Sequence, residues 1–297
     1  MPQISPLLPK EEYIEQAYLF RSLCDRANQN EPIQVLLKNV AAEILATTNL
    51  PKAVDFILDE LNHTGRISTA MRRLPHYFAA FQAFLVEQSE KERGRFDSLM
   101  AFVILYHEAA YRAGEPTPQG LFFYQFEVLC RNRLTYDHGL VAMSQDPIYD
   151  KFWSRWILDI RHKLGIVDIA DLVYVHSQHY QNRRDVEVAS GGESETPDKP
   201  SVILFGEKEG RIALANRKAE PLYFFAALQR QLKYPPVPRP QPRGDTAEIL
   251  SKLQRTIERF EVRIKLLEEE QREKGIDLTK FYQRPDQPPQ DVSRLDE

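Results

Sequence analysis

Residues 95–114 read RFDSLMAFVILYHEAAYRAG, and the apolar side chains of residues 99–105 occur almost all round a helix. A helix that is apolar on every face is buried among other elements. Gly114 ends the segment and is followed by two prolines, a combination that stops one helix and begins the next. The segment therefore predicts the central, most buried helix of an all-helical core.

Helical periodicity extends in both directions from this segment. Apolar side chains recur at three- and four-residue steps, as at Tyr13, Ala17, Phe20 and Cys24. Residues that start or stop helices interrupt the pattern at regular intervals. The clearest are Pro32, Pro51, Gly65, Pro118, Pro147, Gly165 and the N-cap candidate Asp168. We expect a mainly α protein, with about eight helices forming a compact domain over residues 10–185.

Composition limits the classes of function. The 297 residues include 39 Lys and Arg against 43 Asp and Glu, and the net charge of −4 argues against a surface built for nucleic acid or anionic membrane. The two cysteines cannot form a disulfide framework, which favours a reducing compartment. The N-terminus lacks a secretory signal, and the longest apolar run, residues 99–106, is too short to span a bilayer. We expect a soluble, cytoplasmic protein.

The composition changes after residue 185. Residues 186–200 are polar and acidic, which predicts a flexible loop. Two short apolar runs, 202–205 and 211–214, flank a segment with a glycine at each end, a pattern typical of a β-hairpin. We expect this hairpin and the helix after it to form a small unit over residues 201–234.

Prolines divide the C-terminal part of the chain. Eight of the 20 prolines fall in residues 235–242 and 285–289. The first cluster predicts an extended spacer over residues 235–244, because proline-rich segments favour the polyproline II conformation. A helix is expected over residues 245–275, and the polar residues 276–297 predict a disordered tail.

The helix at residues 245–275 has a heptad pattern. Its apolar seam consists of Leu250, Leu253, Ile257, Phe260, Ile264 and Leu267. The seam is only two residues wide in every seven, which is typical of a coiled coil and predicts self-association. Isoleucine at the first seam position favours a parallel dimer, in which Arg263 and Glu268 face each other between chains. The alternative is an amphipathic helix that folds back on its own domain.

Metal ligands give the clearest enzymatic hypothesis. Glu60 and His63 form one acid-x-x-His pair, and Asp159 and His162 form another. Di-metal helix bundles combine two such pairs with carboxylates from two other helices. Candidates for those carboxylates are Glu43, Glu108 and Glu127. Such motifs carry a false-positive risk, and about one pair is expected by chance among seven histidines.

Other polar groups have plainer interpretations. His176 and His179 are three residues apart but lack further zinc ligands in sequence. The sequence Tyr106-His107-Glu108 contains an acid–base pair, but a satisfied polar cluster at the edge of the core is the simpler interpretation. Both cysteines are interpreted as buried structural thiols. No glycine-rich phosphate loop and no serine-nucleophile motif occurs in the sequence.

Nucleic-acid binding is a further alternative. The predicted hairpin region carries four basic residues, Lys208, Arg211, Arg217 and Lys218. Three glutamates, Glu207, Glu209 and Glu220, are interleaved with them and reduce the net positive charge on which phosphate binding depends.

These observations lead to one main hypothesis and two alternatives. The main hypothesis is a non-catalytic helical scaffold or adaptor, without a cofactor or catalytic residues, that binds a protein partner and forms a homodimer through residues 245–275. The first alternative is a metalloenzyme with a helix-bundle carboxylate and histidine site. The second is a nucleic-acid binder that uses the basic hairpin. The sequence identifies no substrate, pathway or specific partner.

Overall fold

The protein is mainly helical in the part of the chain that its structure describes. A computed structural model describes residues 8–27, 31–91, 96–189 and 202–239, together with nine positions between 254 and 265. The chain divides into two compact units, residues 1–240 and 241–297. Within the described ranges the only β-structure is two isolated bridges, so the predicted mainly α class is confirmed. No described helix has the length and apolar character needed to cross a membrane.

The described part of the first unit contains thirteen helices, eleven of which begin within residues 10–185, where about eight were expected. They are α1 (Lys10–Ala27), α2 (Ile33–Glu43), α3 (Leu50–Thr64), α4 (Ile67–Arg73), α5 (Ala80–Ser89), α6 (Ser98–Ala113), α7 (Pro118–Arg131), α8 (Tyr136–Ser144), α9 (Lys151–Lys163), α10 (Ile169–Val175), α11 (Gln178–Ala189), α12 (Glu207–Ala215) and α13 (Pro221–Leu232).

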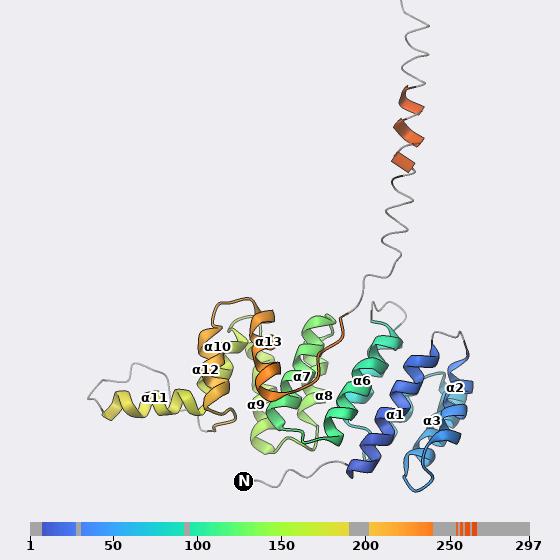
Figure 1. Ribbon diagram of the computed structural model, residues 1–297, viewed down its shortest axis with the longest axis horizontal. Helices are drawn as coiled ribbons and strands as arrows, with labels where there is room; N and C mark the ends of the chain where they lie inside the picture. Colours follow the sequence, from blue (N-terminus) through green and yellow to red (C-terminus); the bar gives the residue numbers. More distant parts are fainter. Residues whose placement is uncertain are drawn as a thin grey trace, which may run out of the picture. The chain divides into compact units, whose positions relative to one another are not determined.

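Eleven of these helices pack in two rows, and the other two, α10 and α11, pack on α12. In the first row, successive contacts join α2, α1, α6, α7, α13 and α12, which lie side by side in Figure 1. In the second row, successive contacts join α3, α4, α5, α8 and α9. The rows are connected where α2 packs on α3, α6 on α5, and α7 on α8. Helices of the second row therefore cover one face of α2, α6 and α7 in the first row.

The helix at residues 118–131, α7, is the most buried of the unit. Every side chain from Gly120 to Leu129 is buried, whereas α6 leaves part of its surface accessible, including the exposed Ala110. The prediction that residues 99–105 form the most buried helix is therefore wrong, because the next helix along the chain is more buried. α7 is more buried because α6, α8 and α13 all pack against it.

The predicted β-hairpin at residues 202–214 is not present. Residues 207–215, which include the second predicted strand, form α12. Gly210 is a site of close helix packing and not part of a turn, since a Cβ atom there would lie 2.3 Å from the Ser177 hydroxyl and 2.7 Å from the His179 Cβ. Glu207 and Arg211 pair one helical turn apart, which also favours the helix.

The first predicted strand, residues 202–205, is an extended segment that inserts one aromatic ring into the core. The Phe205 ring is 1% exposed, and its centroid lies 5.1 Å from that of Trp156 and 5.2 Å from that of Trp153. Backbone hydrogen bonds hold the segment, because Gln178 N donates to Phe205 O at 2.9 Å and Leu204 N donates to His176 O at 2.9 Å. The segment thereby joins α7 and α9 to the turn between α10 and α11.

The beginning of the proline-rich segment packs on the first unit. Tyr234 is buried, and its hydroxyl donates to Glu127 Oε2 at 2.8 Å and lies 3.1 Å from Phe225 O. Val237 is also buried. Residues 233–239 therefore belong to the first unit, and in Figure 1 they run from α13 back across α7.

The second unit is described only at nine positions between 254 and 265, and these are helical. Of the predicted seam, Ile257, Phe260 and Ile264 lie among them, and their exposed fractions are 56%, 58% and 54%. The other three seam residues, Leu250, Leu253 and Leu267, lie outside the described residues, as do most of the predicted acidic loop (residues 190–200), the end of the predicted spacer (residues 240–244) and the tail at 276–297.

Candidate functional site

A buried cluster of charged and polar side chains lies between α6, α7 and the turn after α8. We call it the Arg112 network, and its members are Glu108, Arg112, Gln125, Asp146 and Tyr149. The apolar residues around Glu108 and Arg112 place them in the interior, one turn apart on α6. Their side chains are 0% and 4% exposed, and that of Asp146 is 0% exposed. Buried charges of this kind require partners.

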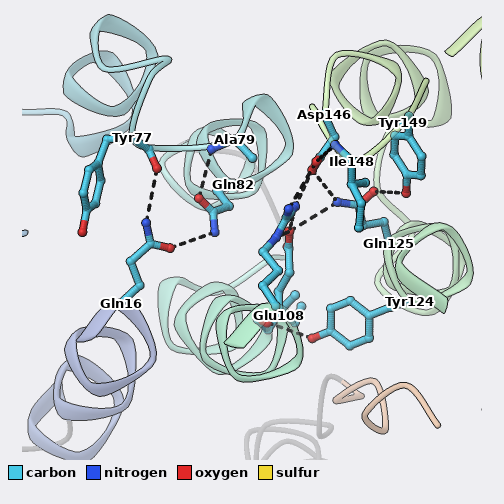
Figure 2. A network of polar contacts seen from close by, with 12 residues as sticks. Gln16, Tyr77, Ala79, Gln82, Glu108, Tyr124, Gln125, Asp146, Ile148 and Tyr149 are labelled. Carbon is cyan, nitrogen blue, oxygen red and sulfur yellow. Dashed lines mark hydrogen bonds and ion pairs between the residues drawn. The ribbon is translucent and has the colours of Figure 1, made fainter. Parts of the chain in front are cut away.

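Arg112 is bonded to both carboxylates. Its Nη2 donates to Glu108 Oε1 at 2.6 Å, and its Nη1 donates to Asp146 Oδ1 at 3.2 Å, with a further ion pair between Nη2 and Asp146 Oδ2. Gln125 Nε2 donates to Glu108 Oε1 at 3.3 Å and to Asp146 Oδ2 at 3.4 Å, and Tyr149 donates to Gln125 Oε1 at 3.0 Å. Figure 2 shows Glu108, Gln125, Asp146 and Tyr149 converging from α6, α7 and the α8–α9 connection.

The network has one more carboxylate than it has cations. Burial raises the pKa of Glu108, although the charge of Arg112 acts in the opposite direction. Burial alone would lower the pKa of Arg112, but Asp146 and Glu108 together raise it well above its usual range. Glu108 Oε2 has no hydrogen-bond partner among the described residues. The arrangement keeps Arg112 charged and favours a proton on Glu108.

A second set of hydrogen bonds fixes the connection before α5. Gln16 Nε2 on α1 donates to Tyr77 O at 3.3 Å, and Gln82 Nε2 donates to Gln16 Oε1 at 3.4 Å. Gln82 Oε1 also accepts from Ala79 N at 3.1 Å, and the Tyr77 hydroxyl donates to Glu12 at 2.7 Å. These bonds hold the start of α5 against α1, and those among Gln16, Tyr77 O, Gln82 and Ala79 N are drawn at the left of Figure 2.

A groove of about 660 Å³ lies beside the connection before α5, and it is bordered by α4, α5 and α8. We call it the α5–α8 groove. Its apolar floor is formed by Met71, Phe78, Ala79, Ala83, Phe84 and Ala142. Its charged rim is formed by Arg72, Glu87, Lys91, Asp137, His138 and Arg161. The floor residues are all buried, so the groove reaches down to the core of the first unit.

Ion pairs fix the rim. Arg72 Nη2 pairs with Glu87 Oε2 between α4 and α5. Arg161 Nε on α9 donates to Asp137 Oδ1 on α8 at 2.5 Å. The Lys91 ammonium donates to the side-chain oxygen of a neighbouring glutamine at 3.0 Å. The rim is therefore organised by contacts within the protein itself.

The groove and the Arg112 network share a wall. Gln145 and Pro147 line the groove, whereas Asp146 between them turns inward to Arg112. Likewise Ala79 and Ala83 line the groove, whereas Gln82 between them is hydrogen-bonded to Gln16. Polar side chains behind the wall therefore hold the backbone that shapes the groove.

The residues of the metal hypothesis lie on α3 and α9, at different places in the second row. Glu60 pairs with Arg73, and His63 is exposed in the last turn of α3. Asp159 and His162 are exposed on α9. Within the described ranges no group of three or more His, Cys, Asp or Glu side chains is placed to hold a metal ion. The metal site stays a prediction, and elemental analysis of the purified protein is its direct test.

The three carboxylates proposed to complete a di-metal site have other partners. Glu43 accepts from Arg26 and Tyr18, and Glu127 accepts from Tyr234 at 2.8 Å. Glu108 belongs to the Arg112 network. Glu108 therefore belongs to a polar cluster, but it is 0% exposed and its Oε2 has no partner among the described residues, so the cluster is neither at the edge of the core nor fully satisfied.

The histidines and basic residues near α12 form surface contacts. His179 Nδ1 lies 2.7 Å from Glu207 Oε1, which also accepts from Arg211 Nε at 3.0 Å. Arg217 pairs with Asp171 and lies 4.2 Å from the centroid of the Tyr174 ring. His176 is partly buried, and burial lowers its pKa. The basic residues of the nucleic-acid hypothesis are thus interspersed with carboxylates, and that hypothesis stays a prediction.

The two cysteines are half-buried free thiols. Burial raises the pKa of Cys24 to about 12 and that of Cys130 to about 11. Because the thiolate is the nucleophilic form, neither is activated for covalent catalysis.

Sequence reasoning did not find Arg112, Gln125, Asp146 or the α5–α8 groove. A local signal for the network is the pair Glu108 and Arg112, two opposite charges four residues apart within an apolar helix. No comparable signal marks Asp146 or the groove, because both depend on helices that meet only in the fold.

Comparisons with known proteins leave the function open. No protein-family model matches the chain, and no curated protein or solved structure matches it either. The functional proposal therefore depends on the geometry described above.

Proposed function

We propose that the protein is a non-catalytic helical scaffold that binds a protein partner through its first unit and self-associates through its C-terminal helix. The observation that carries this proposal is the apolar stripe formed by Ile257, Phe260 and Ile264. All three are more than half exposed on helical residues, at successive steps of three and four. Large apolar side chains left in water at this spacing are typical of a helix that pairs with another helix.

The sequence extends the stripe on both sides. Leu250, Leu253 and Leu267 continue the same two seam positions, so that the seam covers about three heptads. Burial of each large seam side chain contributes about 1.5–3 kcal/mol. A seam of this length supports pairing that is reversible and depends on concentration.

Support for partner binding by the first unit comes from the α5–α8 groove. Its volume of about 660 Å³ lies within the usual range of about 300–1,000 Å³ for ligand pockets. Its apolar floor and polar rim are the combination by which helical segments of partner proteins are commonly bound.

The self-association is tested by light scattering coupled to gel filtration on the full chain. We expect a dimer at micromolar concentration, and a monomer for the double variant Ile257→Asp, Ile264→Asp. The control is Val262→Asp, which replaces one β-branched apolar residue by aspartate at a position that the heptad register places opposite the seam. A monomeric wild type would refute self-association, and a helix folded back on its own chain would give that result.

A further inference from the structure

The α5–α8 groove owes its depth to small side chains. Four alanines line it at positions 79, 80, 83 and 142, where larger side chains would fill the space. Ala80 is only partly buried, so its methyl group lies near the opening. A ligand that enters here therefore meets apolar surface first along α5 and then on the floor.

The rim favours an anionic ligand. It carries three fixed cations, Arg72, Lys91 and Arg161, against the two carboxylates Glu87 and Asp137. His138 adds a fourth basic group. Each arginine contacts its carboxylate partner through a single nitrogen, whereas a guanidinium offers five N–H donors in a planar fork. Both arginines can therefore donate hydrogen bonds to a second carboxylate while they keep the bond to the first.

We propose that the groove binds an amphipathic, acidic helix of a partner protein. Its apolar side chains would enter between α5 and α8, and its Asp or Glu side chains would contact Arg72, Lys91 and Arg161. This inference rests on the proposed function, and it adds the site and the chemistry of the partner. An extended peptide that adds to a sheet edge is disfavoured, because the described residues contain no sheet.

A nucleic acid fits this groove less well than an acidic helix. Glu87 and Asp137 stand on the rim, where they repel a continuous phosphate backbone. The alanine-lined floor complements aliphatic side chains, which nucleic acids lack. A helix can place its acidic residues opposite the three cations and leave uncharged residues opposite the two carboxylates.

The test uses the immobilised full-length protein and a phage library of random 16-residue peptides, which span about 24 Å as helices. We expect the enriched sequences to carry a net negative charge and apolar residues at positions i, i+3 or i+4, and i+7. The most enriched peptide is then synthesised with a fluorescent label, and its affinity for the protein is measured by fluorescence anisotropy.

Two variants test where this peptide binds. Ala80→Trp fills the opening of the groove, and we expect it to weaken binding at least tenfold. Lys91→Glu reverses an exposed rim charge without altering the core, and we expect it to weaken binding about three- to tenfold. The matched controls make the same changes at exposed positions outside the groove, Ala110→Trp on α6 and Lys52→Glu on α3, and should leave the affinity unchanged.

The outcomes separate this inference from the proposed function. Enriched peptides that bind both groove variants as tightly as the wild type would overturn the inference and leave partner binding by another surface intact. Enriched sequences without an acidic bias would overturn the stated chemistry. A library that yields no binder would count against both the groove and partner binding by the first unit. Displacement of the peptide by single-stranded poly(U) RNA would favour a nucleic-acid ligand and overturn the proposal.

Discussion

Replacement of Arg112 by methionine isolates the contribution of its charge. Methionine is unbranched and apolar, so it fills much of the space of the arginine stem while removing the guanidinium. The change leaves Glu108 and Asp146, both 0% exposed, without their cation. Removing one partner of a buried ion pair costs about 3–5 kcal/mol, because the remaining charge is neither hydrated nor paired. The matched variant Glu108→Gln keeps the pair between Arg112 and Asp146 and should change stability by less than about 1 kcal/mol.

The two variants should also differ in their dependence on pH. Because burial raises the pKa of Glu108 above 4.5, the folded protein holds a proton there that the unfolded chain has already lost. The wild type therefore loses stability as pH rises from about 4.5 through the raised pKa, and Glu108→Gln removes this loss. In Arg112→Met the pKa of Glu108 is no longer lowered by the arginine charge. Its destabilisation should therefore be greater at about pH 8 than at about pH 5.

Urea unfolding followed by tryptophan fluorescence measures these effects. The chain's two tryptophans, Trp153 and Trp156, are both buried in the first unit, so that their emission reports its unfolding. With a slope of about 3 kcal/mol/M, the loss in Arg112→Met lowers the urea midpoint by about 1–1.7 M. A loss below about 1 kcal/mol, or a loss of equal size at both pH values, would refute the account of the network.

Three further predictions concern the core. Phe205→Ala should destabilise the first unit by about 3–5 kcal/mol in urea unfolding, whereas Phe152→Ala, at a ring that is 60% exposed, should have little effect. Gly210→Ala should cost about 1–3 kcal/mol by thermal unfolding, because its methyl group overlaps the neighbouring turn; an unchanged midpoint would contradict that close packing. Cys24 and Cys130, with pKa values of about 12 and about 11, should react slowly with a disulfide reagent at neutral pH and rapidly in urea; fast reaction of the folded protein would disprove their burial.

Helices whose ends carry local signals could be predicted from the sequence. Gly65 ends α3 with a φ of 71°, in the left-handed conformation that glycine adopts readily. Pro118 begins α7, and Asp168 caps α10 by accepting from Ala170 N at 3.1 Å. In each case the residue that marks the boundary acts on its own backbone or on its nearest neighbours. No distant part of the chain is needed to interpret it.

The hairpin prediction failed where the local signal was ambiguous. Residues 211–214 are too few to distinguish the period of 2 of a strand from the period of 3.6 of a helix. The glycines at both ends of the intervening segment therefore favoured a hairpin. Gly210 is instead required by the approach of Ser177, 33 positions earlier in the sequence. The α5–α8 groove was missed for a related reason. Its lining comes from helices separated by about fifty residues. An alanine in the sequence does not indicate whether the space beside it is filled by another residue or left open.

The insertion of Phe205 has a consequence for how the chain folds during synthesis. The aromatic rings that it covers belong to residues 122–156, which leave the ribosome well before residue 205. The bond from Tyr234 to Glu127 closes a still longer loop of 107 positions. Until both arrive, the nascent chain presents a large aromatic surface to solvent or to chaperones, and such surfaces promote aggregation. Translation that pauses or stops between these residues would therefore release a species with an incomplete core.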